Sequence, residues 1–390
     1  MEQNNQLIFD LIKLGILDCN LQTIQSQIPL NMFKSIYDIS KAHNVSHLLY
    51  AALKKNDLFL TANKAETEQY IQSCRQDYLY SAYKCVQIDK EKFEISKVLN
   101  NLGIKHVFLK GAVLRNIYPQ IWMRTSGDLD CLVPEERLFD AVEALKKSGY
   151  NTDGQKHYHD IELDKPSIHL ELHFNIQENN TFLDNVLKTV WNNVEQVSDF
   201  EYVESSDFFV FHHIAHMAYH ITTGGCGIRP FVDLWVMKNR FPYNEDAVHE
   251  MCKTAHINDF FVLANRMVGI WFENESHDQD TLKFERFILN SATFGTIESK
   301  QNLSEYKKSK TKKNIISHLF LPYEQMKEAY PILNKHKILL PYYEMYRLVK
   351  KSFDREQRAY LTSVLNTTDK NLDADVKEVL RVSGLANIIQ

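Results

Sequence analysis

The hydrophobic period of the chain changes twice along its 390 residues, and this change limits the possible folds more than any other feature. Up to about residue 100, apolar residues recur at helical spacing with almost no glycine or proline. Between residues 104 and 175 the segments are short and β-rich, and after residue 205 helical spacing returns. A sheet-forming segment enclosed by helices predicts an α+β protein.

Three regions follow from this pattern. We expect an N-terminal helical region at residues 1–100, a core with a mixed sheet at residues 101–200, and a C-terminal helical domain at residues 201–390. Residues 64 to 101 keep the helical period for so long that they predict one long helix or two nearly continuous ones. The polar and basic stretch at residues 298–314 predicts a solvated loop.

The composition excludes several classes of protein. The chain is 44% hydrophobic, enough for a large core, and its formal net charge of −5 disfavours a surface that binds duplex DNA or anionic lipid. The six cysteines form no CxxC pair, and no stretch approaches the roughly 20 apolar residues of a membrane helix. We therefore expect a cytoplasmic protein that is unlikely to bind nucleic acid and does not bind a membrane. The oligomeric state stays open.

Asp128 and Asp130 are the strongest chemical signal in the sequence. They stand two residues apart in SGDLDCLV, a turn that runs into a short apolar strand, so both side chains should share one sheet face. Adjacent carboxylates repel each other unless a cation lies between them, and Mg²⁺ binds one or two carboxylates together with water and phosphate oxygens. The alternative is a polar loop that caps a helix beginning near Pro134.

An apolar strand precedes this pair and passes into a helical stretch at Lys110 and Gly111, within VFLKGAVL. A glycine at such a junction lets backbone N–H groups at the helix N-terminus approach a phosphate, and Lys110 adds a positive charge. A strand, a glycine turn, a helix and a second strand with D-x-D together favour a site for a nucleotide and a metal.

At these residues the sequence resembles a known family. LKGAVLRNIYP followed by RTSGDLDCLV is similar to a family of mostly uncharacterised bacterial nucleotidyltransferases, which belongs to the superfamily typified by DNA polymerase β and carries an LKG motif and an R-x-S-x-D-[IL]-D motif. The resemblance extends from about residue 40 to 350. It implies a polymerase β-like core that uses Mg²⁺ or Mn²⁺ and a nucleoside triphosphate such as ATP.

The resemblance also implies roles for individual residues. The triphosphate would be steered by four of them: Lys110, Gly111, Arg124 and Ser126. Ala112 departs from the superfamily pattern, which has Gly or Ser after the first glycine, so the usual hydroxyl contact to phosphate is absent there. This departure leaves open the alternative of an inactive protein that binds a nucleotide or a partner on the same fold.

Glu171 is the candidate for a third carboxylate. In SIHLELHF the apolar residues face one way and His169, Glu171 and His173 face the other, so Glu171 can be brought against Asp128 and Asp130 across neighbouring strands. By the resemblance it would bind a second metal or accept the proton of the attacking hydroxyl. The alternative is a solvent-facing strand with ordinary polar residues.

Sixteen histidines raise a zinc interpretation. A His-rich zinc metallohydrolase would use Glu171 with four histidines of this segment: His157, His159, His169 and His173. That alternative leaves the Lys-Gly turn and D-x-D without a role. Farther along, three histidines share one helical face, which we expect to line the cleft for acceptor contacts or support: His212, His216 and His220. Residues 222–230 predict a turn before the helix that holds Asp233.

The sequence therefore predicts a metal-dependent nucleotidyltransferase. An acceptor hydroxyl, on a small molecule, a sugar or a protein side chain, would attack the α-phosphorus of a Mg²⁺-bound nucleoside triphosphate and release pyrophosphate. Asp128 and Asp130 would hold the metals, and Glu171 would join them and assist deprotonation. The base preference and the identity of the acceptor are not encoded in any motif of the chain.

Overall fold

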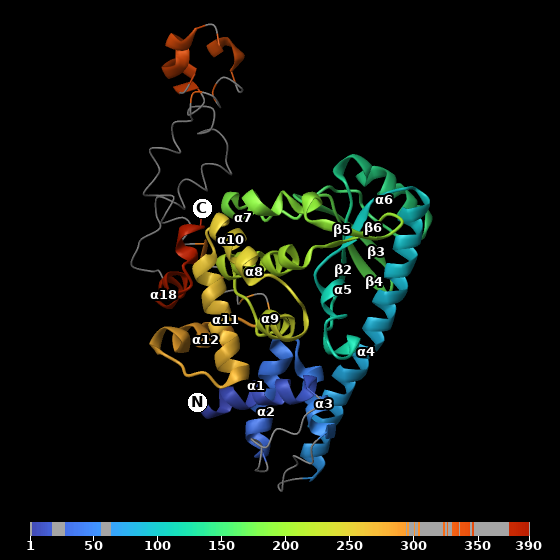
Figure 1. Cartoon of the computed structure of the whole chain (residues 1–390), viewed down its shortest axis with the longest axis vertical. Coiled ribbons are helices and arrows are strands. Elements are labelled where there is room, and N and C mark those ends of the chain that lie inside the picture. The colour runs from blue at the N-terminus through green and yellow to red at the C-terminus, as the bar shows by residue number, and fades with distance from the viewer. Residues whose placement is uncertain are drawn as a thin grey trace.

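The fold is built on a six-stranded mixed sheet with the strand order β3-β4-β2-β1-β6-β5 (Figure 1). The computed structural model describes residues 2–17, 28–55, 64–293 and 374–389, together with isolated residues and short stretches between residues 295 and 346. The strands are β1 His106–Phe108, β2 Asp128–Leu132, β3 Asp160–Lys165, β4 Ile168–His173, β5 Val194–Ser198 and β6 Glu201–Glu204. Strand β2 runs parallel to β4, and β1 runs parallel to β6, whereas the remaining neighbours are antiparallel. The predicted α+β class with a mixed sheet is confirmed.

One face of the sheet is apolar and packs against the helices α4 (Lys64–Asn101) and α6 (Leu138–Lys147). Strict alternation creates this face, because Leu129, Cys131 and Leu170 all point to the same side of β2 and β4 and are fully buried. The acidic residues of the same strands therefore point to the opposite side.

The segment that follows β2 differs from its expected form. The sequence suggested a helix that begins near Pro134, but one 3-10 turn, η2 (Glu135–Arg137), comes first, and α6 begins only after it. Pro134 has extended backbone angles, φ −59° and ψ 136°, so it precedes the helical turns instead of opening them.

Helix α4 confirms the long helix expected at residues 64–101, as a single element of 38 residues. It runs along one side of the molecule from the N-terminal helices to the sheet (Figure 1). The N-terminal helices are α1 Glu2–Ile16, α2 Leu30–Ala42 and α3 Ser46–Lys55.

The N-terminal and C-terminal helices share one large hydrophobic core, although they are far apart in sequence. The ring of Phe9 on α1 stacks on Trp271 with the two centroids 4.3 Å apart. The C-terminal helices are α7 Thr181–Leu187, α8 Ser206–Thr223, α9 Arg229–Arg240, α10 Glu245–Thr254, α11 Asn258–Glu273, α12 Gln279–Asn290 and α18 Ala374–Val382. None of the described helices combines the length and apolar composition that a bilayer-spanning segment needs. Most of the expected loop at residues 298–314 lies outside the described residues.

Short elements complete the description. The helix α5 (Gly111–Leu114) follows β1 after one tight turn. The 3-10 turns are η1 Ile121–Met123, η2 Glu135–Arg137, η3 Val190–Asn192, η4 Pro331–Asn334, η5 Lys337–Leu339 and η7 Leu385–Asn387.

Candidate active site

The turn between β1 and α5 holds Lys110 in a backbone conformation that normally belongs to glycine. Its angles are φ 46° and ψ −121°, and the N–H of Ala112 donates to the carbonyl of Leu109 at 3.2 Å, which closes a tight turn. A non-glycine residue at positive φ costs on the order of 1–3 kcal/mol and is concentrated at functional sites. The turn aims the Lys110 side chain at the acidic face of the sheet.

Gly111 has a different reason to be glycine. A Cβ atom added there would lie 1.7 Å from the hydroxyl of Ser126 and 3.5 Å from the guanidinium of Arg124. The missing side chain therefore lets the loop before β2 pass directly over the start of α5. This close approach brings together the four residues that the sequence assigned to the triphosphate.

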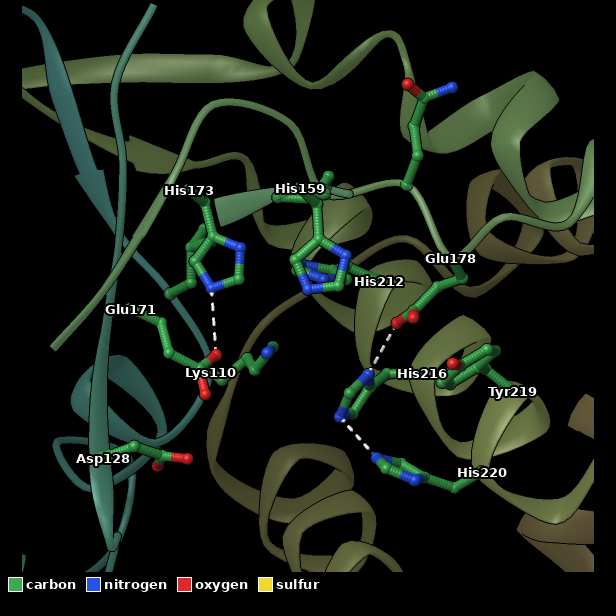
Figure 2. A pocket seen from close by; sticks show the side chains of 13 residues that line it. Lys110, Asp128, His159, Glu171, His173, Glu178, His212, His216, Tyr219 and His220 are labelled. Atoms are coloured by element: carbon green, nitrogen blue, oxygen red, sulfur yellow. Dashed lines mark hydrogen bonds and ion pairs between the residues drawn. The ribbon is translucent and has the colours of Figure 1, made fainter. Parts of the chain in front are cut away.

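The predicted carboxylates meet on one face of the sheet. Asp130 is paired in parallel register with Glu171, and Asp128 lies two residues earlier on β2. Figure 2 shows Asp128 and Glu171 on this face. Lys110 Nζ lies 2.9 Å from Asp130 Oδ1. His173 Nε2 lies 3.0 Å from the same Oδ1 and 3.4 Å from Glu171 Oε2. The structure thus joins Asp128, Asp130 and Glu171, as the sequence predicted.

Charge repulsion shapes the pKa values of this cluster. Burial, followed by repulsion from Asp130 and Glu171, raises the pKa of Asp128. Burial also works against the charge of Asp130, but the Lys110 ammonium and the His173 hydrogen bond outweigh it and hold the pKa of Asp130 far below its usual range. Lys110 is partly buried, yet its acidic neighbours raise the pKa of its ammonium. The donor set of carboxylate oxygens suits Mg²⁺ or Mn²⁺, and Asp130, Glu171 and His173 present ligand atoms within 4.8 Å of one another.

Two cavities adjoin this cluster and share part of their walls. The first has a volume of about 240 Å³ and the second of about 110 Å³. Both are lined by Lys110, Asp128, His212, His216 and His220. The first adds mostly residues of β4, the following loop and α8: Glu171, His173, Gln177, Glu178 and Tyr219. The second adds Gly111, the cationic side chains of Arg124 and Arg229, and the hydroxyl of Ser126.

Arg124 is held firmly in the wall of the second cavity. Its Nε donates to both carboxylate oxygens of Asp233, at 2.7 Å and 2.9 Å, and the hydroxyl of Tyr118 donates to the same carboxylate at 2.6 Å. Burial opposes the charge of Arg124, but Asp233 raises the pKa of its guanidinium. The sequence placed Arg124 on the triphosphate without recognising that a buried acid on α9 neutralises it.

Arg229, at the start of α9, is a functional candidate that sequence reasoning missed. Its Nε is buried and has no hydrogen-bond partner among the described residues. Burial and the nearby charge of Arg124 lower the pKa of Arg229 to about 10. A cation at a helix N-terminus that lines a cavity is suited to bind an anion. The available signal was the glycine-rich turn at residues 222–230, to which we assigned no functional role from the sequence.

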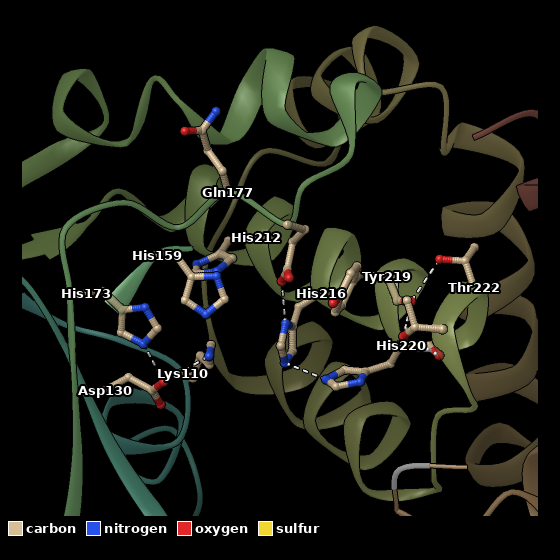
Figure 3. Close-up of polar contacts among 12 residues, drawn as sticks. Lys110, Asp130, His159, His173, Gln177, His212, His216, Tyr219, His220 and Thr222 are labelled. Carbon is tan, nitrogen blue, oxygen red and sulfur yellow. Dashed lines mark hydrogen bonds and ion pairs between the residues drawn. The ribbon is translucent and has the colours of Figure 1, made fainter. Parts of the chain in front are cut away.

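The three histidines of α8 line both cavities, as expected from their shared helical face (Figure 3). His212 Nδ1 lies 2.9 Å from Glu204, and His216 Nδ1 lies 2.7 Å from Glu178. The other nitrogen of His216 lies 2.9 Å from His220 Nε2. Burial lowers the pKa of His216 well below its ordinary value and that of His220 to about 3, so both rings are neutral at neutral pH. Glu178 was not found from sequence because it lies in a loop without periodicity.

The four histidines of the zinc alternative do not converge on one point. His159 and His173 stack with ring centroids 5.2 Å apart. His157 instead lies 3.9 Å from Glu162, and His169 lies 2.8 Å from Asp164. Within the described residues, neither His157 nor His169 belongs to a group that could hold a metal.

Comparison with known proteins agrees with this geometry. No curated protein and no solved structure matches the chain. A family described as uncharacterised nucleotidyltransferase matches residues 32–273, which is more than half of the chain and includes both cavities apart from Thr293. The turn at Lys110, the carboxylates of β2 and β4, and the histidines of α8 all lie inside the matched segment. The chain therefore belongs to the uncharacterised nucleotidyltransferase family.

Proposed function

We propose that this protein transfers a nucleoside monophosphate from a nucleoside triphosphate to an acceptor hydroxyl, with Mg²⁺ or Mn²⁺ as the metal. The observation that carries the proposal is the register of β2 against β4, which sets Asp130 directly opposite Glu171 on the face that also carries Asp128. Three acids gathered on one buried face are costly without a cation, which supports a metal site over a decayed core.

The second cavity is suited to the triphosphate. Lys110 and Arg229 bring two cations to its wall, and Ser126 adds a hydroxyl donor beside the Gly111 turn. Asp233 already neutralises Arg124. We therefore propose that Arg124 shapes the wall of the cavity and makes a weaker contact to the phosphates than Lys110 and Arg229 do. Lys110 would shift from Asp130 to the phosphates, because the bound metal takes over the neutralisation of that acid.

The first cavity is suited to the acceptor. At about 240 Å³ it admits a small molecule, one sugar unit or a protein side chain rather than a folded nucleic acid. Glu178 and Tyr219 line its wall and could orient hydroxyl groups, and the neutral ring of His216 has its Nδ1 held by Glu178. The shared wall at Asp128 would place the acceptor beside the α-phosphorus.

The chemical step follows from these positions. The acceptor oxygen forms a bond to the α-phosphorus, the bond from that phosphorus to the bridging oxygen breaks, and pyrophosphate leaves with the electron pair. Glu171 accepts the hydroxyl proton. Asp128, Asp130 and Glu171 would hold a divalent cation, which would neutralise the charge on the phosphoryl oxygens.

The setting of the reaction is also proposed. Cys74, Cys85, Cys131, Cys226 and Cys252 are buried free thiols, which supports a reducing compartment such as the cytoplasm. The net charge of −5 supports acceptors other than long nucleic acid.

The test is transfer of label. The protein is incubated with Mg²⁺, a cell extract and each of the four α-labelled ribonucleoside triphosphates, and the molecule that acquires label is identified. Asp130→Asn keeps the size of the side chain but removes one negative charge from the metal site, so turnover should fall by about 100-fold or more while nucleotide binding changes little. Lys110→Ala should instead raise the apparent nucleotide constant more than it lowers the maximal rate.

The matched control is Asp140→Asn, which removes an exposed acid of α6 that is paired with Arg137. Its turnover should equal that of the parent. Turnover of Asp130→Asn within a few-fold of the parent would show that the carboxylate mechanism is wrong. Nucleotide binding without label transfer in any extract would favour the inactive binding protein.

A further inference from the structure

A second group of potential metal ligands lies beside the carboxylate cluster, on the antiparallel pair β3 and β4. Asp160 is directly opposite His173 in the register of this pair, and His159 precedes Asp160. His159, Asp160 and His173 each present one ligand atom, and these atoms lie within 4.8 Å of one another. His159 and His173 also line the first cavity and lie side by side there (Figure 2).

The group contains buried polar atoms without partners. Asp160 is 6% exposed and His173 is 2% exposed, yet Asp160 Oδ1 and His173 Nδ1 have no hydrogen-bond partner among the described residues. His159 Nδ1 is buried and unpartnered as well. Leaving a buried polar group unsatisfied costs on the order of 1–3 kcal/mol, so the unpartnered atoms of these three neighbouring residues favour a further ligand at the group.

The surroundings of His173 prepare its free nitrogen for a metal. Its Nε2 lies 3.0 Å from Asp130 and 3.4 Å from Glu171, so these carboxylates accept the Nε2 proton and leave Nδ1 for a ligand. A metal-binding histidine commonly donates its other N–H to a carboxylate, which fixes the ring and strengthens it as a ligand.

The separations suit a small cation. Tetrahedral zinc with ligand bonds of 2.0–2.1 Å sets its donor atoms about 3.3 Å apart. His159 Nε2 and Asp160 Oδ2 are 3.0 Å apart in a hydrogen-bonded ion pair, which a cation bound by the same two atoms would replace. Two imidazole nitrogens and one carboxylate oxygen favour zinc over magnesium, which prefers an all-oxygen shell.

We infer that His159, Asp160 and His173 form a second divalent-cation site, selective for Zn²⁺ or a similar imidazole-binding metal, which adjoins the carboxylate site through His173. Three protein ligands leave a coordination position for water or for an acceptor group in the first cavity. The inference does not rest on the proposed transfer reaction, because it concerns metal binding alone.

The experiment is a zinc titration of the full-length protein in millimolar Mg²⁺, which saturates the carboxylate site. Bound zinc is measured by competition with a chromophoric chelator and by elemental analysis after dialysis, and Co²⁺ is used as an absorbing substitute. The parent should bind one zinc per chain. His159→Gln and Asp160→Asn should each weaken zinc binding by about 100-fold or more, since even outer contacts to a metal site are worth 10–100-fold.

The matched controls are His157→Gln and His169→Gln, because both residues lie in the same part of the chain but outside the group. They should bind zinc like the parent. Asp128→Asn should also retain zinc, since Asp128 belongs only to the carboxylate cluster. Should Asp160→Asn fail to fold, His159→Gln decides, because the His159 side chain is 33% exposed.

Several results would overturn the inference. If His159→Gln binds zinc as tightly as the parent, or if the parent has no zinc site, the inference is wrong. Water would then be the partner of the buried atoms. Loss of zinc in Asp128→Asn but not in His159→Gln would place the metal at the carboxylates. Label transfer that fails while zinc binding behaves as expected would contradict only the proposed function.

Discussion

Arg229 and Arg124 illustrate how two neighbouring arginines can carry different roles. Arg124 faces a buried carboxylate at 2.7 Å, whereas the Nε of Arg229 is buried without a partner among the described residues. A buried, unpartnered Nε in the wall of a cavity that Lys110 also lines favours binding of an anion, because a charge-assisted hydrogen bond is worth about 1.5–3 kcal/mol.

Replacement of Arg229 by glutamine should therefore weaken nucleotide binding by about 10–100-fold and change the maximal rate much less. Binding of a non-hydrolysable triphosphate analogue by calorimetry measures the first effect, and label transfer at saturating nucleotide measures the second. Arg266→Gln is the control, because Arg266 is half-exposed and pairs with Asp278 outside both cavities. Equal affinity of the parent and Arg229→Gln would remove Arg229 from the nucleotide site.

At the residue scale, the sequence predicts what short-range geometry determines. Asp128, Asp130 and Glu171 were found because the period of two in a strand fixes which side chains share a face. Arg229 and Glu178 were missed because each comes from a loop or helix end, where only tertiary packing brings it to the cavities. The partners of the histidines on α8 were unpredictable for the same reason.

Among the elements, the turn before α5 makes the sharpest structural demand. Gly111 packs under Ser126, and a methyl group there would collide with the Ser126 hydroxyl. Gly127, only one residue beyond that serine, has no atom within 4 Å of the position that a Cβ would take. The two glycines therefore offer a matched pair for testing the close contact between this turn and the loop before β2.

Gly111→Ala should destabilise the protein by about 1–3 kcal/mol, as overpacking does elsewhere, whereas Gly127→Ala should be neutral within about 0.5 kcal/mol. Adding Ser126→Gly to Gly111→Ala should restore much of the loss, because it removes the colliding atoms. Urea unfolding of the parent, Gly111→Ala, Ser126→Gly and the double variant forms a double-mutant cycle. Additive effects in this cycle would mean that the two loops do not touch as described.

Elements with strong patterns were predictable and weakly patterned ones were not. Helix α4 and the strands β2 and β4 have clear periods, and they occur as expected. The strand β5 is mostly exposed and lacks an alternating apolar face, so residues 194–198 gave no comparable signal. The helix start predicted near Pro134 was wrong because proline is common both at the first helical position and just before it.

On the scale of the whole molecule, buried neutral histidines make stability sensitive to acid. His47 is 4% exposed and lies 2.9 Å from the carbonyl of Met123. Burial, with smaller effects from nearby arginines, lowers the pKa of His47 to about 4. This pKa lies below that of the same histidine in the unfolded chain, so the folded state binds fewer protons. The contribution of neutral His47 to stability is complete above about pH 6.5 and declines as the pH falls toward 4.

Between about pH 7 and about pH 4, His47 alone should account for a loss of about 2–3 kcal/mol in the free energy of unfolding. Urea titrations at both pH values measure this loss in the parent and in His47→Gln, which keeps a donor but cannot be charged. The variant should lose less stability on acidification, whereas His157→Gln, which lacks only an exposed ring, should follow the parent. Identical acid sensitivity in all three would show that His47 titrates normally.

The arrangement of the helical regions could not be predicted from the sequence. The N-terminal and C-terminal helices make contact in one core, where Phe9 and Trp271 stack across more than 250 residues of sequence. No local pattern encodes such a contact, because any apolar helix face can pack against any other of suitable shape.

Helix α4 has a consequence for how the protein folds. At 1.5 Å per residue it is about 57 Å long, and it contributes Cys74 to the core of the helical regions and Ile88 and Ile95 to the core beneath the sheet. Helices gain most of their stability from tertiary packing. Each core therefore stabilises α4, and α4 in turn contributes residues to the other core. The two cores should therefore form and dissolve together as one cooperative foldon, and amide exchange along the middle of α4 should report global unfolding alone.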